Sequence, residues 1–131
     1  MFRRSLIILL VLLPFAATAH SPLATLSPKD GAVLEQAPAE VEMVFKSLVK
    51  LIKLEMQKLN SEECSSLLDC LFTGNKGTNV TLDKHFLMKE SKQYLIGLPS
   101  LDAGDYIIKW RALGEDGHVI KGEFRFKVLG I

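Results

Sequence analysis

The chain has 131 residues, a length typical of one domain, and its 16 lysines and arginines nearly balance its 15 aspartates and glutamates. A formal net charge of +1 argues against nucleic-acid binding and gives no reason for attachment to an anionic membrane surface. The hydrophobic fraction of 48% is normal for a globular protein, although part of it belongs to the amino-terminal segment.

Residues 1–19 have the features of a cleaved secretory signal peptide. Arg3 and Arg4 form a basic start, an unbroken apolar run extends from Leu6 to Leu13, and Ala17-Thr18-Ala19 has the small-x-small form that signal peptidase cleaves. We predict cleavage before His20, which leaves one exported domain of residues 20–131. A retained anchor is the alternative, although the apolar run is shorter than the ~20 residues that span a bilayer.

A turn and a strand are predicted after His20. Residues 28–31 (PKDG) favour a turn, because proline fixes one backbone dihedral and glycine supplies a positive one. Val41, Met43 and Phe45 occupy every second position, which is the period of a half-buried strand.

The stretch from residue 48 to residue 59 permits two predictions. Ile52, Leu54 and Met56 occupy alternate positions, as in a strand, but the same stretch can also be arranged as an amphipathic helix. The neighbouring predicted strands lead us to prefer a strand.

Residues 60–79 are predicted to be an excursion between strands, with room for one helical turn over Glu62–Leu68. They contain Cys64 and Cys70, and a disulfide is the expected state of two nearby cysteines in an oxidising compartment. A metal or redox pair is the alternative, but the spacing is not Cys-x-x-Cys and the chain has no other cysteine. Short strands are predicted over Val80–Leu82 and Tyr94–Leu98.

The last third of the chain has the clearest alternation. Apolar residues occupy every second position of two segments and charged residues lie between them; the apolar residues are Tyr106, Ile108, Trp110 and Ala112, then Phe124, Phe126 and Val128. Residues 102–106 (DAGDY) resemble the tyrosine corner of immunoglobulin-type sandwiches, where a tyrosine hydroxyl bonds to the upstream backbone. Several short strands, with no long helical pattern and no internal repeat, predict an all-β sandwich.

His20 is a candidate metal ligand because of the predicted cleavage site. An amino-terminal histidine offers two nitrogens, the free α-amine and ring Nδ1, which close a chelate ring on a metal ion. The amine has an ordinary pKa of ~7.7–8.0, so a metal competes with about one proton there near neutral pH. Nitrogen ligands in a planar arrangement favour Cu(II) over the other first-row divalent ions.

Asp116-Gly117-His118 is the candidate second half of this site. Aspartate and histidine two residues apart point to the same side of an extended chain, so both could face one ion. With His20, they would supply three nitrogens and one carboxylate oxygen. A purely structural turn between two strands remains the alternative for this triplet.

The exported part of the chain resembles the CopC family of periplasmic copper-binding proteins over nearly its whole length. The W-R…D-G-H…G-x-F-x-F string is the most specific part of the resemblance, and the cysteine-bearing stretch from Leu59 to Phe72 is the part without a counterpart. The matching segments are the signal peptide ending before His20, then residues 27–32 (SPKDGA), 38–41 (PAEV), 101–106 (LDAGDY), 110–112 (WRA) and 116–126 (DGHVIKGEFRF).

The resemblance implies an immunoglobulin-like Greek-key β-sandwich of about seven strands, with one Cu(II) ion held by His20, Asp116 and His118. It also implies a periplasmic carrier or buffer in copper homeostasis and resistance, acting beside an inner-membrane copper transporter of the CopD type. We expect a monomer that has no nucleic-acid partner and is not an enzyme.

The chain departs from the family in its candidate copper ligands. Many members have F-S-E-P where residues 45–48 read FKSL, so an acidic neighbour of the metal region is missing. Some members carry a methionine-rich loop for Cu(I), whereas Met43, Met56 and Met88 are scattered here. His85 lies three residues before Met88, and this pair leaves a Cu(I) site open as a hypothesis.

Two other functions fit an amino-terminal histidine on a sandwich. Copper-dependent polysaccharide monooxygenases also bind copper through an amino-terminal histidine and a second histidine, but they need a broad substrate face and an open copper coordination position. This chain is short for such an enzyme, and Asp116 would occupy a coordination position. The third possibility is an immunoglobulin-like interaction module that binds no metal.

Overall fold

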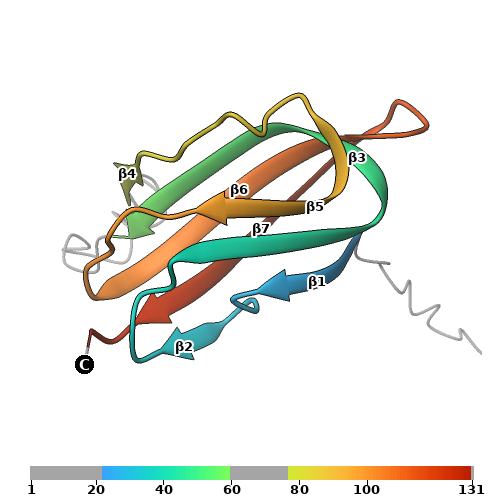
Figure 1. Ribbon diagram of the computed structural model, residues 1–131. Helices are drawn as coiled ribbons and strands as arrows, with labels where there is room; N and C mark the ends of the chain where they lie inside the picture. The colour runs from blue at the N-terminus through green and yellow to red at the C-terminus, as the bar shows by residue number, and fades with distance from the viewer. Residues whose placement is uncertain (1–21, 60–76, 131) are drawn as a thin grey trace, which may run out of the picture.

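The computed structural model describes residues 22–59 and 77–130, which form seven β-strands and no helix. The strands are β1 (Leu23–Ser27), β2 (Ala32–Leu34), β3 (Glu40–Leu59), β4 (Gly77–Val80), β5 (Glu90–Gly97), β6 (Gly104–Gly114) and β7 (Val119–Val128), as Figure 1 shows.

The predicted signal peptide, His20, the two cysteines and the helical turn over Glu62–Leu68 lie outside the described residues. Within them, no helix is long and apolar enough to cross a membrane.

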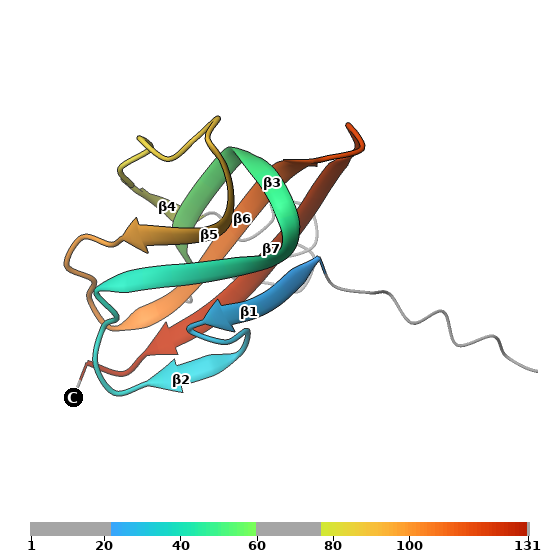
Figure 2. The same ribbon diagram turned by 45° about the vertical axis from the view of Figure 1, so that its right-hand side comes forward.

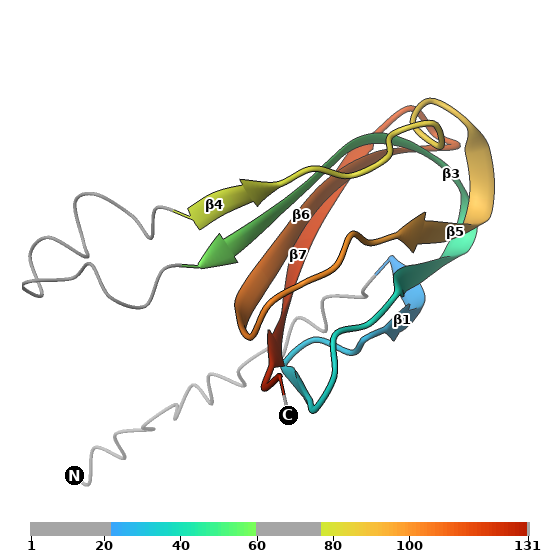
Figure 3. The same cartoon turned by 60° about the vertical axis from the view of Figure 1, so that its left-hand side comes forward.

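The strand β3 belongs to both layers of a sandwich. Its first half pairs with β1 on one side and β5 on the other, and its second half pairs with β4 and β6. The change occurs at residues 45–48, where the register with β5 shifts and the strand bends from one layer into the other. Beyond β6, the second layer continues through β7 to β2, which is parallel to β7. Figure 3 shows the two layers, with β5 and β1 facing β6 and β7.

The core lies between the layers, and β6 and β7 supply much of it as the alternation predicted. Tyr106, Ile108, Trp110 and Ala112 are all buried, and so are Phe124, Phe126 and Val128. Phe45 joins the two layers because its ring lies edge-on to Trp110 at 5.3 Å and to Tyr94 at 6.0 Å between centroids. Each such aromatic side chain contributes ~1.5–3 kcal/mol through burial alone.

The second half of β3 is a strand, as preferred over the helix, but one of its predicted inward residues is wrong. Leu51 is fully buried, whereas Ile52 is only half-buried. The register with β6 shifts between Leu51 and Lys53, so an extra residue is inserted and the alternation changes phase there. The predicted strand over Val80–Leu82 ends at Val80, and Leu82 is buried outside a strand.

Two predicted local motifs are confirmed. The Tyr106 hydroxyl donates a hydrogen bond to the Asp102 carbonyl oxygen at 2.6 Å, which is the expected tyrosine corner. In the predicted turn, Gly31 has a φ of +80° and Asp30 accepts a hydrogen bond from the Arg125 backbone N–H at 3.0 Å. This bond ties the start of β2 to β7.

Candidate metal centre at the β6–β7 turn

A tight turn joins β6 to β7 and carries Asp116 and His118. The Gly114 N–H donates to the His118 carbonyl oxygen at 2.9 Å, and the Gly117 N–H donates to the Gly114 carbonyl oxygen at 3.1 Å. Gly117 has a φ of +81°, a conformation in which residues with a Cβ are strained. The turn therefore projects from the end of the two paired strands (Figure 1), and residues 115–119 are all exposed.

Asp116 holds His118 through two hydrogen bonds. Its Oδ1 accepts the His118 backbone N–H at 3.0 Å, and its Oδ2 lies 2.8 Å from the His118 ring Nδ1. These bonds, with the backbone one the larger, lower the pKa of the Asp116 carboxyl below its ordinary value. An ionised carboxylate only accepts hydrogen bonds, so the ring proton lies on Nδ1. In the neutral imidazole, Nε2 then keeps its lone pair, which is the form that binds a metal.

The two side chains meet for a different reason from the one that the spacing suggested. An extended chain was the expected geometry, but residues 115–117 form a turn. The reversal of the chain at Gly117 brings the imidazole back to the carboxylate. Both side chains remain open to an ion, since 68% of Asp116 and 83% of His118 is exposed.

The chain enters the sandwich at the end that carries this turn. The Lys46 N–H donates to the Pro22 carbonyl oxygen at 3.1 Å, and Val49, three residues further along β3, pairs with Gly114. Figures 1 and 2 agree that the start of β1, the bend of β3 and the β6–β7 turn share one end of the molecule. His20, two residues before Pro22, lies outside the described residues. Among the described residues, no group of three or more His, Cys, Asp or Glu side chains could hold a metal ion.

The structure contains a second Asp–His pair that the sequence analysis missed. Asp83 Oδ2 lies 2.9 Å from His85 Nδ1, and Asp83 Oδ1 accepts the His85 backbone N–H at 3.1 Å. The backbone bond is again the larger cause of a lowered pKa, here for the Asp83 carboxyl. The Asp-x-His spacing was the available signal.

The hypothesis of a Cu(I) site at His85 and Met88 gains no support from the described contacts. His85 contacts Asp83 and the ring of Phe86. Met88 is 62% exposed, and Met43 and Met56 are buried in the core.

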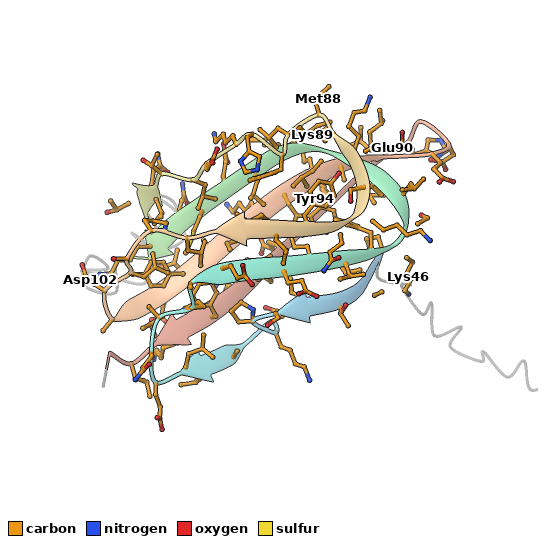
Figure 4. The ribbon with its side chains drawn as sticks, in the orientation of Figure 1. Lys46, Met88, Lys89, Glu90, Tyr94 and Asp102 are labelled. Carbon is orange, nitrogen blue, oxygen red and sulfur yellow. The ribbon has the colours of Figure 1, made fainter. Side chains whose placement is uncertain are left out.

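Tyr94 is a further residue whose role the sequence did not indicate. Its hydroxyl accepts the Leu51 N–H at 3.2 Å, lies 2.8 Å from the Val49 carbonyl oxygen and also contacts the Lys89 carbonyl oxygen. Burial raises the pKa of this hydroxyl. Figure 4 shows Tyr94 beneath the connection that carries Met88 and Lys89. Tyr94 therefore holds that connection to the region of β3 just after the bend. In that region, Val49 pairs with Gly114 at the start of the β6–β7 turn.

Comparison with known proteins gives one family and a consistent fold. The CopC domain family matches residues 23–129. The chain is similar to CopC from Methylosinus trichosporium OB3b, with 23% identity, a TM-score of 0.57, and coverage of 84% of this chain and 94% of that one. It is also similar to PcoC, a copper resistance protein from Escherichia coli, with 21% identity, a TM-score of 0.58, and coverage of 81% and 97%. Another PcoC structure, described as a methionine-rich copper resistance protein, gives 20% identity, a TM-score of 0.58, and coverage of 84% and 99%.

The comparison with curated proteins found no match. At these identities the solved structures bear on the fold alone. They confirm the predicted fold class, an all-β, immunoglobulin-like Greek-key β-sandwich with seven strands in the described residues.

Proposed function

The chain belongs to the CopC family of copper resistance proteins, and on this premise we propose that it binds one Cu(II) ion and carries or buffers copper in the periplasm. The ligands are His20, Asp116 and His118. The observation that supports this proposal best is the Asp116–His118 pair, which holds an exposed imidazole with Nε2 free at the end of the sandwich where the chain enters.

Cleavage before His20 would place the new amino terminus two residues before Pro22. Two residues of extended chain span at most ~7 Å, and Pro22 is already anchored to β3 near the pairing partner of Gly114. In the proposed site, His20 contributes its amine and ring Nδ1, and His118 contributes Nε2. Nδ1 and Nε2 lie on opposite sides of the His118 ring, so Asp116 contacts an ion at Nε2 only after its carboxylate leaves Nδ1 and turns towards that ion.

The proposed role is that of a carrier and not of an enzyme. We propose an exported domain of residues 20–131, released from a signal peptide of residues 1–19, that acts as a monomer. An inner-membrane copper transporter of the CopD type is the proposed partner. Three nitrogens and a carboxylate hold Cu(II) as cargo, and no described feature favours a monooxygenase-like reaction or a second, Cu(I) site.

The test compares Cu(II) binding by the protein that begins at His20 with binding by the same protein carrying one extra residue before it. Quenching of Trp110 fluorescence gives the stoichiometry and affinity, and electron paramagnetic resonance reports the nitrogen ligands. We expect one tightly bound ion that is lost on extension. Equal binding by both forms would mean that the terminal amine is not a ligand.

His118→Ala and His85→Ala form a matched pair for the second half of the site. Both histidines are exposed and both are held by an aspartate two residues earlier. We expect His118→Ala to weaken Cu(II) binding by about tenfold or more, because it removes one of the three proposed nitrogen ligands of the copper ion. His85→Ala should leave the affinity unchanged, and equal losses in both variants would contradict the proposed site.

A further inference from the structure

Three cations lie side by side on the outer face of the second layer. Lys53 of β3 pairs in register with Arg111 of β6, and Arg111 pairs with Lys121 of β7. All three are exposed. Like charges directly opposite each other on neighbouring strands destabilise a sheet. This row therefore does not exist to strengthen the fold.

The nearby acidic residues neutralise this cationic row only in part. In the next row along the strands, Glu55 and Glu123 flank Lys109. Glu55 lies 3.3 Å from Lys53, while Glu123 lies 4.0 Å from Arg125, which is not one of the three. Within residues 22–59 and 77–130, neither Arg111 nor Lys121 has an ion-pair partner.

The cationic row borders a shallow hollow of about 360 Å³. Gly122 forms part of its lining, and a Cβ at this residue would come within 2.6 Å of the Trp110 ring. Gly122 therefore contributes backbone to the hollow, while the side it shares with Trp110 faces the core. The row is also close to the β6–β7 turn, because Lys121 follows His118 by three residues and the exposed Val119 lies between them.

We propose that this face, defined by Lys53, Arg111 and Lys121, is a docking surface for an acidic segment of a partner protein. Strands lie ~4.8 Å apart, so the row extends over ~10 Å, and an extended peptide places side chains on one face every ~6.6 Å. Two carboxylates of one segment can therefore contact the row together, whereas a single small anion contacts only part of it. Complementary charge guides such a segment to the end of the molecule that carries His118.

The test measures binding of a fluorescently labelled peptide of alternating glutamate and serine, with a glutamine–serine peptide for comparison. It uses the protein that begins at His20, which contains the whole described sandwich, and no copper. We expect the acidic peptide to bind and the glutamine peptide not to bind. Added salt should weaken the binding strongly, since ions screen charges beyond ~8 Å at physiological ionic strength.

Arg111→Gln and Lys121→Gln should each weaken peptide binding about three- to fivefold, the effect of one exposed ion pair. Lys127→Gln is the matched control, because Lys127 is also an exposed cation of β7 but pairs with Asp105 at 3.9 Å, away from the row. It should leave the affinity within about twofold. The melting temperature of Arg111→Gln and Lys121→Gln should not fall, because removing one of three adjacent cations relieves repulsion.

Three results would overturn the proposal. The first is equal binding of both peptides, and the second is a loss in Lys127→Gln as large as in Arg111→Gln. The third is complete displacement of the peptide by millimolar inorganic phosphate at constant ionic strength, which would show a site for small anions. None of these results depends on copper, so the proposed Cu(II) site stands or fails separately.

Discussion

Asp116 orients the proposed ligand His118 through contacts between residues that are only two positions apart in the sequence. Its two oxygens bind the backbone and the ring of a residue two positions later. Because the pKa of its carboxyl is lowered, Asp116 stays ionised at acidic pH values at which an ordinary aspartate is already protonated. Protonation of the nitrogen donors, and not of Asp116, therefore sets the acid limit of copper binding.

We predict that Cu(II) affinity falls from neutral pH to about pH 5 in the parent protein and in Asp116→Asn alike. Asp116→Asn should be weaker by about tenfold at every pH, the usual effect of losing the residue that orients a metal-binding histidine. Copper titrations in a series of buffers measure both curves. If the two affinities converged between neutral pH and about pH 5, Asp116 would be titrating in this range, contrary to its lowered pKa.

The residue scale also shows which parts of the site the sequence could predict. Asp116 and His118 are two residues apart, so their meeting was predictable, and a turn between two strands was already the alternative for this triplet. Tyr94 was not predictable, because its hydroxyl bonds to Leu51 and Val49, which lie 43 and 45 residues away. A contact of this kind depends on the whole arrangement of strands.

At the scale of elements, β6 and β7 were predictable because each has one face in the core and one in water, which fixes a period of two. The strand β3 was harder, because its phase changes at Ile52. That change is set by pairing with β6, which the sequence of β3 does not contain. Pairing with β4, β5 and β6 is also what makes residues 48–59 a strand and not the alternative amphipathic helix.

The region just after the β3 bend gives a prediction for Tyr94→Phe. Removing the hydroxyl leaves the Leu51 N–H without the partner that Tyr94 supplies, and buried unsatisfied groups cost about 1–3 kcal/mol. Urea unfolding should show this loss. Tyr106→Phe is the comparison, since it removes one hydrogen bond to a carbonyl oxygen and should cost only about 0.5–1.5 kcal/mol. A Tyr94→Phe protein as stable as the parent would mean that the bend holds without the hydroxyl.

The molecule as a whole separates its tasks by location. The core between the layers consists of apolar side chains, and the described residues include no buried charged residue. Asp116, His118 and the three residues of the cationic row are all exposed and lie outside this core. Changes at either site should therefore leave the packing between the layers intact.

The passage of one strand, β3, through both layers has a consequence for how the domain opens. A strand with hydrogen bonds in each sheet couples their unfolding, so neither sheet can be released without disrupting the other. We predict that backbone amides in both halves of β3 exchange hydrogen with solvent through the same global opening, with equal free energies in native-state exchange measurements. Clearly unequal values would mean that the layers open independently. If the two layers do open together, a ligand bound at one end also protects distant amides, by ~2.7 kcal/mol at a hundred times its dissociation constant.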